Sequence, residues 1–195
     1  DGDDVAEALA RAHHLSEQAY VVDLAWLRST PWRERVAATF DPPHLRPELR
    51  TISSVTIRHH PDSTVAGLLL VGWLASRLGW EPARLHRADG GRALRGTARR
   101  DGGDVAIRLE PAPEQQVRGL ATLELVAAHG RSLRLDRGEG GLRARRRDAH
   151  GNESEWTLMG ASRGESGILA EGIRQALLRD PTYAPALAAA EAMAA

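Results

Sequence analysis

The chain has 195 residues, of which 42% are hydrophobic and 27% charged, enough for one domain with a buried core. Its 26 acidic residues are balanced by 26 basic ones, all of them arginine, so non-specific nucleic-acid binding, which needs a positive surplus, is not expected. Because the sequence has neither cysteine nor lysine, these residues offer no disulfide, thiolate metal site or Schiff-base amine.

The apolar segments are too short for a membrane. The longest apolar run, residues 65–75, falls short of the roughly 20 residues that a spanning helix needs. The chain begins at Asp1 rather than methionine, and no basic segment leads into an apolar one. We therefore expect a cytoplasmic protein with no membrane partner, and a chain that is processed or belongs to a longer protein.

The first predicted elements are a helix and a short strand. Asp3 or Asp4 can cap a helix that runs to about His14. Residues 20–22, with the sequence Tyr-Val-Val, are a strand candidate.

A second helix is predicted in the tryptophan-bearing segment, residues 23–43. Thr30 is a suitable cap and Pro31 suits the first helical position. Trp32, Val36 and Phe40 then recur at a spacing of four residues and share one face. The two prolines after residue 41 end the helix.

The two tryptophans of this segment allow two interpretations. In the first, Trp32 belongs to a buried stripe with its neighbours on the same helix face. In the second, Trp26 and Arg28 face a partner protein, since Trp and Arg are common hot-spot residues. Both can hold together, with Trp32 inside and Trp26 outside.

A strand and a buried helix are predicted next. Residues 51–58 are rich in Ile, Val, Thr and Ser, which is typical of a strand. Residues 64–78 form a helix that is apolar almost all round and ends at Gly79, so we expect it to pack in the core. Residues 81–92 are expected to be a flexible connection.

From residue 93 to residue 159 the hydrophobic pattern has a period of two. Gly-rich turn sequences interrupt it, and the pattern predicts a meander of about five or six antiparallel strands. Residues 164–179 and the Ala-rich segment after Thr182 are predicted to form closing helices. The predicted fold class is therefore α+β, a single domain over residues 1–195. It comprises a helix, strand and helix part (1–92), the mostly antiparallel meander (93–160) and the closing helices (164–195).

Candidate catalytic groups are weak. His59 and His60 are adjacent, and neighbouring residues on a strand point to opposite faces, which does not suit chelation of one metal ion. Residues 160–164 match Gly-x-Ser-x-Gly around Ser162, but no histidine follows that serine in the chain. We therefore predict no catalytic residue, no metal and no cofactor.

One predicted strand carries an arginine-rich face. Arg143, Arg145 and Arg147 alternate with Leu142 and Ala144, so the three arginines point to the same side. They could bind phosphates or an acidic partner. The alternative is a solvated face paired to carboxylates such as those of residues 124 and 153, and RNA is the least favoured partner because no aromatic side chains interleave with the arginines.

Several motifs of the chain occur in a fixed order: Asp23-Leu-Ala-Trp26, Thr30-Pro-Trp-Arg-Glu34, Phe40-Asp41, Gly164-Glu-Ser166, Leu169-Ala-Glu171, Asp180-Pro-x-Tyr183 and Ala186-Leu187. This combination resembles the OpcA family, the bacterial glucose-6-phosphate dehydrogenase assembly proteins. The resemblance covers most of the chain and indicates the C-terminal domain of a longer protein with a preceding α/β domain.

The resemblance implies a non-catalytic assembly factor or allosteric effector. Its partner would be glucose-6-phosphate dehydrogenase, whose active form it would promote in the oxidative pentose phosphate pathway. The predicted partner-binding residues are Asp23, Trp26, Arg28, Trp32, Arg33, Arg143, Arg145 and Arg147. Replacing Trp26 or Arg33 by alanine is expected to weaken activation and leave the fold intact. The alternative function is a sugar-phosphate-binding module or enzyme that uses the arginine-rich face.

Overall fold

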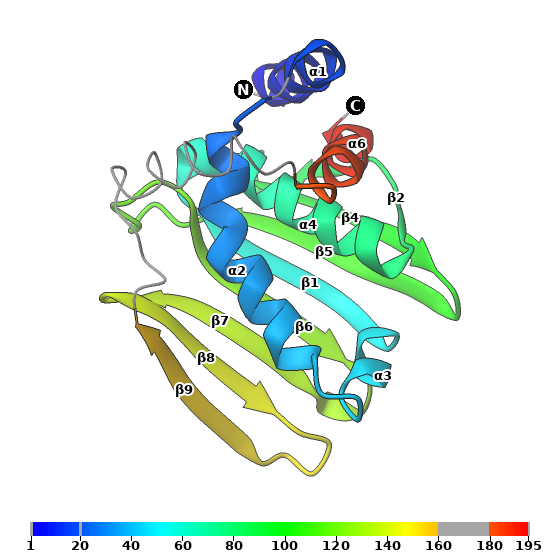
Figure 1. Ribbon diagram of the computed structural model, residues 1–195, viewed down its shortest axis with the longest axis vertical. Coiled ribbons are helices and arrows are strands. Elements are labelled where there is room, and N and C mark those ends of the chain that lie inside the picture. The colour runs from blue at the N-terminus through cyan, green and yellow to red at the C-terminus, as the bar shows by residue number, and fades with distance from the viewer. Residues whose placement is uncertain (1, 20, 160–179, 195) are drawn as a thin grey trace.

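A computed structural model describes residues 2–19, 21–159 and 180–194. Figure 1 shows a large twisted sheet with the described helices on one of its faces. The helices are α1 (Gly2–Gln18), α2 (Leu24–Phe40), α3 (Arg46–Leu49), α4 (Thr64–Leu78) and α6 (Tyr183–Ala194), with single 3₁₀ turns η1 (Pro61–Ser63) and η2 (Ala128–Gly130). The strands are β1 (Ile52–His59), β2 (Glu81–Pro82), β3 (His86–Ala88), β4 (Ala93–Arg100), β5 (Gly103–Pro111), β6 (Leu120–Ala127), β7 (Ser132–Gly138), β8 (Gly141–Arg147) and β9 (Glu153–Met159).

Within the described residues the sheet has nine strands, in the order β2-β4-β5-β1-β6-β7-β8-β9, with β3 paired to β4. Every pairing is antiparallel except that of β1 with β5. This confirms the predicted α+β class with a mixed, mostly antiparallel sheet. The alternating pattern predicts the strands from β4 to β9 as one meander, and the structure differs in one respect: β1 lies between β5 and β6, so β5 and β6 are not neighbours.

Helix α4 confirms the predicted buried helix, and it begins and ends at the predicted residues, 64 and 78. Gly79 adopts φ 67°, ψ 34°, and the left-handed conformation that glycine tolerates stops the helix there. One side of α4 faces the sheet, and α6 lies across its other side with α1 beyond α6 (Figure 1). Leu68, Leu69 and Leu70 are consecutive and fully buried, which requires cover on nearly every side of the helix.

Helix α2 begins earlier than predicted. It starts at Leu24 and is capped by Asp23, whose Oδ1 accepts hydrogen bonds from the N–H groups of Ala25 (2.8 Å) and Trp26 (3.1 Å). Pro31 therefore lies inside the helix instead of at its first position, and Thr30 is not the cap. A good aspartate cap and buried side chains on both sides of the proline outweigh the hydrogen bond that the proline removes.

Other boundaries also differ from the sequence predictions. The first helix continues past His14 to Gln18. Residues 21 and 22 are not in a strand, and the segment 81–92 contains β2 and β3 instead of being a plain connection. The predicted helix over 164–179 lies outside the described residues. Within the part of the chain that is described, no helix is long and apolar enough to cross a membrane.

Close packing of α4 against α6 depends on Gly72. An added Cβ at this position would lie 2.2 Å from the carbonyl oxygen of Ala186. We expect Gly72→Ala to lower the free energy of unfolding by about 2 kcal/mol, because the helices must separate, even though alanine favours helix. Urea unfolding measures this change.

The matched control for that experiment is Gly67→Ala on the same helix. Its added Cβ would meet the end of the Leu109 side chain at 2.8 Å, which can rotate away. We expect a change within about 1 kcal/mol for this control. Equal unfolding midpoints for the two variants would contradict the packing described for α4 and α6.

Candidate functional site

The start of α2 and the start of α6 are joined through a group of five side chains, Asp23, Trp26, Arg33, Asp180 and Tyr183, which we call the clasp. Asp180 Oδ2 accepts hydrogen bonds from Trp26 Nε1 (3.0 Å) and Arg33 Nη1 (3.1 Å). Tyr183 donates its hydroxyl to Asp23 Oδ2 at 2.8 Å. The ring of Tyr183 meets that of Trp26 edge-on, with centroids 5.4 Å apart.

The two aspartates of the clasp have equivalent roles. Asp23 uses Oδ1 to cap α2 and Oδ2 to bind Tyr183 on α6. Asp180 uses Oδ1 to accept from the N–H and hydroxyl of Thr182, just before α6, and Oδ2 to bind α2. Each carboxylate therefore orders the start of its own helix and holds the other helix.

The Arg33 guanidinium bridges the turn that contains Pro31. It lies 3.4 Å from the centroid of the Trp26 ring, a cation–π contact. Its Nε donates to Ser29 Oγ at 3.1 Å, and its Nη2 donates to Thr30 Oγ1 at 2.9 Å. Because Pro31 cannot donate to the preceding turn, these bonds link the two halves of α2 in its place.

The electrostatics of the clasp follow from its burial. Arg33 is 7% exposed, and burial lowers the pKa of its guanidinium, against the opposing effect of Asp180. Burial alone would raise the pKa of Asp180, but hydrogen bonds from Thr182 and the Arg33 guanidinium outweigh it and hold that pKa below its ordinary value. Burial, together with the charge of Asp23 and the bond to it, raises the pKa of Tyr183 well above its ordinary value.

Both tryptophans of the segment face inward. Trp32 is 1% exposed and lies in the core with Val36 and Phe40, as predicted. Trp26 is 3% exposed, so the interpretation in which it faces outward to a partner is wrong. The expectation that alanine at Trp26 or Arg33 leaves the fold intact must also be corrected, because both side chains belong to the buried clasp.

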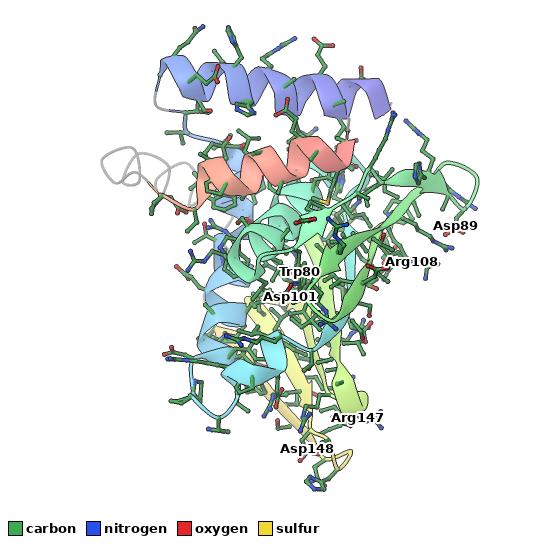
Figure 2. The ribbon with its side chains drawn as sticks, turned by 90° about the vertical axis from the view of Figure 1, so that its right-hand side faces the viewer. Trp80, Asp89, Asp101, Arg108, Arg147 and Asp148 are labelled. Carbon is green, nitrogen blue, oxygen red and sulfur yellow. The ribbon has the colours of Figure 1, made fainter. Side chains whose placement is uncertain are left out.

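The arginine-rich face lies on the opposite side of the sheet from the clasp. Arg143, Arg145 and Arg147 alternate along β8 with the buried Leu142 and Ala144, as predicted. Figure 2, turned to the side, shows Arg147 near the lower end of the sheet, far from the helices α1 and α6.

Carboxylates match the arginines of this face. Arg143 and Arg145 lie 3.4 Å and 3.2 Å from the carboxylate of Glu155, and Arg147 lies 3.7 Å from that of Glu153. A groove of about 550 Å³ runs over these strands. The pairing with Glu153 agrees with the alternative interpretation of a solvated, ion-paired face.

Arg28 and the two histidines occupy other places. Arg28 is half-buried on α2, and its Cδ lies 3.7 Å from where a Cβ on Gly119 would stand. His59 is buried at the end of β1, and the Nδ1 of His60 accepts the N–H of Asp62 at 3.1 Å. Among the described residues no three His, Cys, Asp or Glu side chains gather as a metal site would require. The segment around Ser162 lies outside the described residues.

Comparison with known proteins identifies the family. Residues 19–187 match the domain family described as the C-terminal domain of a glucose-6-phosphate dehydrogenase subunit. The chain belongs to the OpcA family. Both halves of the clasp lie within the matched range.

Curated relatives of the OpcA family include three proteins named "Putative OxPP cycle protein OpcA". The one from Synechococcus elongatus is 37% identical over 89 residues, covering 46% of this chain and 20% of the relative. The one from Nostoc punctiforme is 40% identical over 70 residues (36% and 15%), and that from Synechocystis is 34% identical over 76 residues (39% and 16%). The matched segments thus span a fifth or less of each relative's length.

Among solved structures, a dehydrogenase (MviM) from Clostridium difficile superposes with a TM-score of 0.44 at 14% identity, over 78% of this chain and 56% of that one. A superposition at this score carries no argument about fold or function.

The clasp brings together two segments that lie far apart in the sequence. Asp23-x-x-Trp26 and Asp180-x-x-Tyr183 both place an aromatic residue three positions after an aspartate, and the structure brings them into contact. This repeated spacing is the signal in the sequence that links the two segments. Asp180 and Tyr183 are the residues that sequence reasoning missed.

Replacing Asp180 by asparagine tests the clasp. The change leaves the Arg33 guanidinium buried without a carboxylate, and we expect the free energy of unfolding to fall by about 2 kcal/mol, less than for a fully buried pair because the Asp180 side chain is 29% exposed. The control is Asp41→Asn, whose ion pair with Arg46 is exposed and should be worth less than about 1 kcal/mol. Urea unfolding of both variants at neutral pH measures the two changes in free energy. If Asp180→Asn is no less stable than Asp41→Asn, the stabilising role of the clasp is wrong.

The pH dependence of the same variant gives an independent prediction. Because the pKa of Asp180 is lowered in the folded protein, its stabilising effect is complete above the unfolded pKa of about 3.9 and is lost as pH falls through the folded value. The difference in unfolding free energy between wild type and Asp180→Asn should therefore be constant above about pH 5 and shrink below about pH 4. Urea unfolding at a series of pH values measures it, and a difference that grows on acidification would contradict the assignment.

Proposed function

We propose that the chain is a non-catalytic part of an assembly factor or allosteric effector that binds glucose-6-phosphate dehydrogenase and promotes its active form. The observation that carries the proposal is the family match over residues 19–187, whose description names a subunit of that dehydrogenase. The names of the curated relatives, which refer to the OxPP cycle, agree with it. We place the protein in the cytoplasm, with no nucleic-acid or membrane partner.

The arginine-rich face is the proposed contact surface. Its three arginine side chains are 44–57% exposed, and each is held only by an exposed carboxylate. Exposed ion pairs of this kind are worth about 0–1 kcal/mol, so carboxylates of a partner can replace Glu153 and Glu155 at little cost. A polar, charged face of this kind suits a protein contact that must distinguish one state of the partner from another.

The tryptophan-bearing segment has an indirect role in this proposal. Asp23, Trp26, Trp32 and Arg33 are largely used inside the molecule, where they fix α2 and α6. Arg28, which is half-buried on the same helix, is the member of the segment that we propose to contact the dehydrogenase.

A triple variant tests the contact surface. With Arg143, Arg145 and Arg147 changed to glutamine in the full-length protein, we expect activation of the cognate dehydrogenase to weaken about tenfold or more, since effectors typically couple through about 1–3 kcal/mol. The stability of the variant should be close to that of wild type, because only exposed pairs are removed. Activity assays with increasing effector, and pull-down of the dehydrogenase, measure the effect.

The matched control is a triple variant on β4 and β5 of the same sheet, in which Arg95, Arg99 and Arg108 are changed to glutamine. These arginines also pair with carboxylates and are 42–76% exposed. The control therefore removes the same number of positive charges as the first triple variant, also from exposed side chains. Activation should survive in the control. If both triple variants activate as wild type does, the contact surface lies elsewhere; if wild type itself neither binds nor activates the dehydrogenase, the proposed function fails.

A further inference from the structure

A cavity of about 770 Å³ lies between the β3–β4 hairpin and the first turns of α1 and α4. It is separate from the clasp and from the arginine-rich face. Figure 2 shows the hairpin, marked by Asp89, projecting beside and below the ends of α1 and α6. Its inner wall is apolar and includes Leu68, Leu109 and Met193, and the N–H of Leu85 donates to the Met193 carbonyl at 2.8 Å, which joins the two sides. The volume lies in the range of small-molecule sites, roughly 300–1,000 Å³.

Three cationic side chains at this cavity have no carboxylate partner. Arg84, Arg87 and Arg92 all line it, and within the described ranges none of them forms an ion pair. Arg87 and Arg92 donate only to main-chain carbonyls of the hairpin turn, at 3.4 Å and 3.3 Å. The nearby carboxylate of Asp89 binds Arg95 instead, at 2.5 Å. The hairpin therefore presents positive charge that the described chain does not neutralise.

A buried histidine supplies a second polar group. His59 is 3% exposed and lines the cavity. Its Nδ1 lies 2.8 Å from the carbonyl oxygen of His60, which can only accept, so Nδ1 carries the proton and Nε2 has a lone pair. Burial lowers the pKa of His59, which keeps the ring neutral. Within the described residues no hydrogen bond to Nε2 is formed, so this nitrogen can accept one from a ligand or water.

Acidic groups offset only part of the positive charge. Asp4 and Asp62 also line the cavity, and Asp62 is matched by Arg118 at 3.5 Å. The first turns of α1 and α4, which line it too, direct the positive ends of their helix dipoles toward the same space. The cavity thus combines an apolar wall, a surplus of guanidinium groups and one neutral hydrogen-bond acceptor.

We propose that this cavity binds a small phosphorylated metabolite that carries hydroxyl groups. Arg84, Arg87 and Arg92 hold the phosphate, and a hydroxyl of the ligand donates to His59 Nε2. Guanidinium groups recognise phosphate by paired, charge-assisted hydrogen bonds, and the neutral imidazole prefers a donor to a second anion. The ligand would reach the protein on the side of the sheet opposite to the arginine-rich face.

Calorimetric titration of the full-length protein tests this with two probes, inorganic phosphate and glucose 6-phosphate, at fixed ionic strength and with glucose as the neutral control. We expect phosphate to bind weakly, glucose 6-phosphate to bind more tightly, and glucose alone to give no signal. The double variant R87Q/R92Q should weaken both phosphorylated probes at least about tenfold, which corresponds to the loss of one charge-assisted hydrogen bond. Its melting temperature without ligand should stay at the wild-type value, because neither arginine is buried or ion-paired.

Two further variants make the result decisive. R143Q/R145Q, on the other face of the sheet, should bind both probes like wild type. H59F should weaken the binding of glucose 6-phosphate but not that of inorganic phosphate, since the arginines hold the phosphate group and only the sugar places a further hydroxyl at His59. Absence of binding by both phosphorylated probes at millimolar concentration, or unchanged affinities in R87Q/R92Q, would overturn the proposal. Since no dehydrogenase is present in the titration, its outcome is independent of the proposed function.

Discussion

The buried guanidinium of Arg33 is the interaction on which the helical layer depends. A charge at this depth is costly unless it is neutralised, and Asp180 neutralises it from a segment far along the chain. Because the same guanidinium stacks on Trp26 and spans the turn that Pro31 weakens, the internal order of α2 and its attachment to α6 depend on one group. Helix α6 in turn covers α4. Because α4 has no polar face, its leucine side chains would be exposed to water without this cover. Loss of this one charge pair would therefore loosen three helices together.

The residues on which the resemblance to the OpcA family rests are mainly structural in this chain. Trp26 and Arg33 form internal contacts, whereas the sheet face that could meet another protein is built from exchangeable exposed ion pairs. An effector of the proposed kind needs both features: a well-ordered body, and a surface whose ion pairs are weak enough for a partner's charges to replace them. The cavity beside the β3–β4 hairpin lies on the helical side of the sheet, opposite to the arginine-rich face. A small ligand in the cavity and a partner protein on the arginine-rich face can therefore be bound at the same time.

Patterns within short stretches of the sequence correctly predicted the elements that those stretches alone determine. The limits of α4 follow from its apolar run and Gly79, and the common face of Arg143, Arg145 and Arg147 follows from the alternation along a strand. The start of α2 was misplaced because Thr30 and Pro31 form a convincing helix start of their own, and only tertiary contacts make Asp23 the cap in use. The insertion of β1 between β5 and β6 and the bond from Trp26 to Asp180, 154 residues away, are long-range pairings that no local pattern specifies.

The place of α6 in the chain has a consequence for synthesis on the ribosome. Helix α4 and strand β1 emerge early, but β1 cannot complete its pairing until β5 and β6 have been made, and α4 cannot be covered until α6 has been made. The nascent chain therefore carries an unpaired β1 until β6 has been made, and an incompletely covered apolar α4 until α6 has been made. The helical layer can therefore be completed only after α6 has left the exit tunnel, and until then the apolar surface of α4 is open to aggregation.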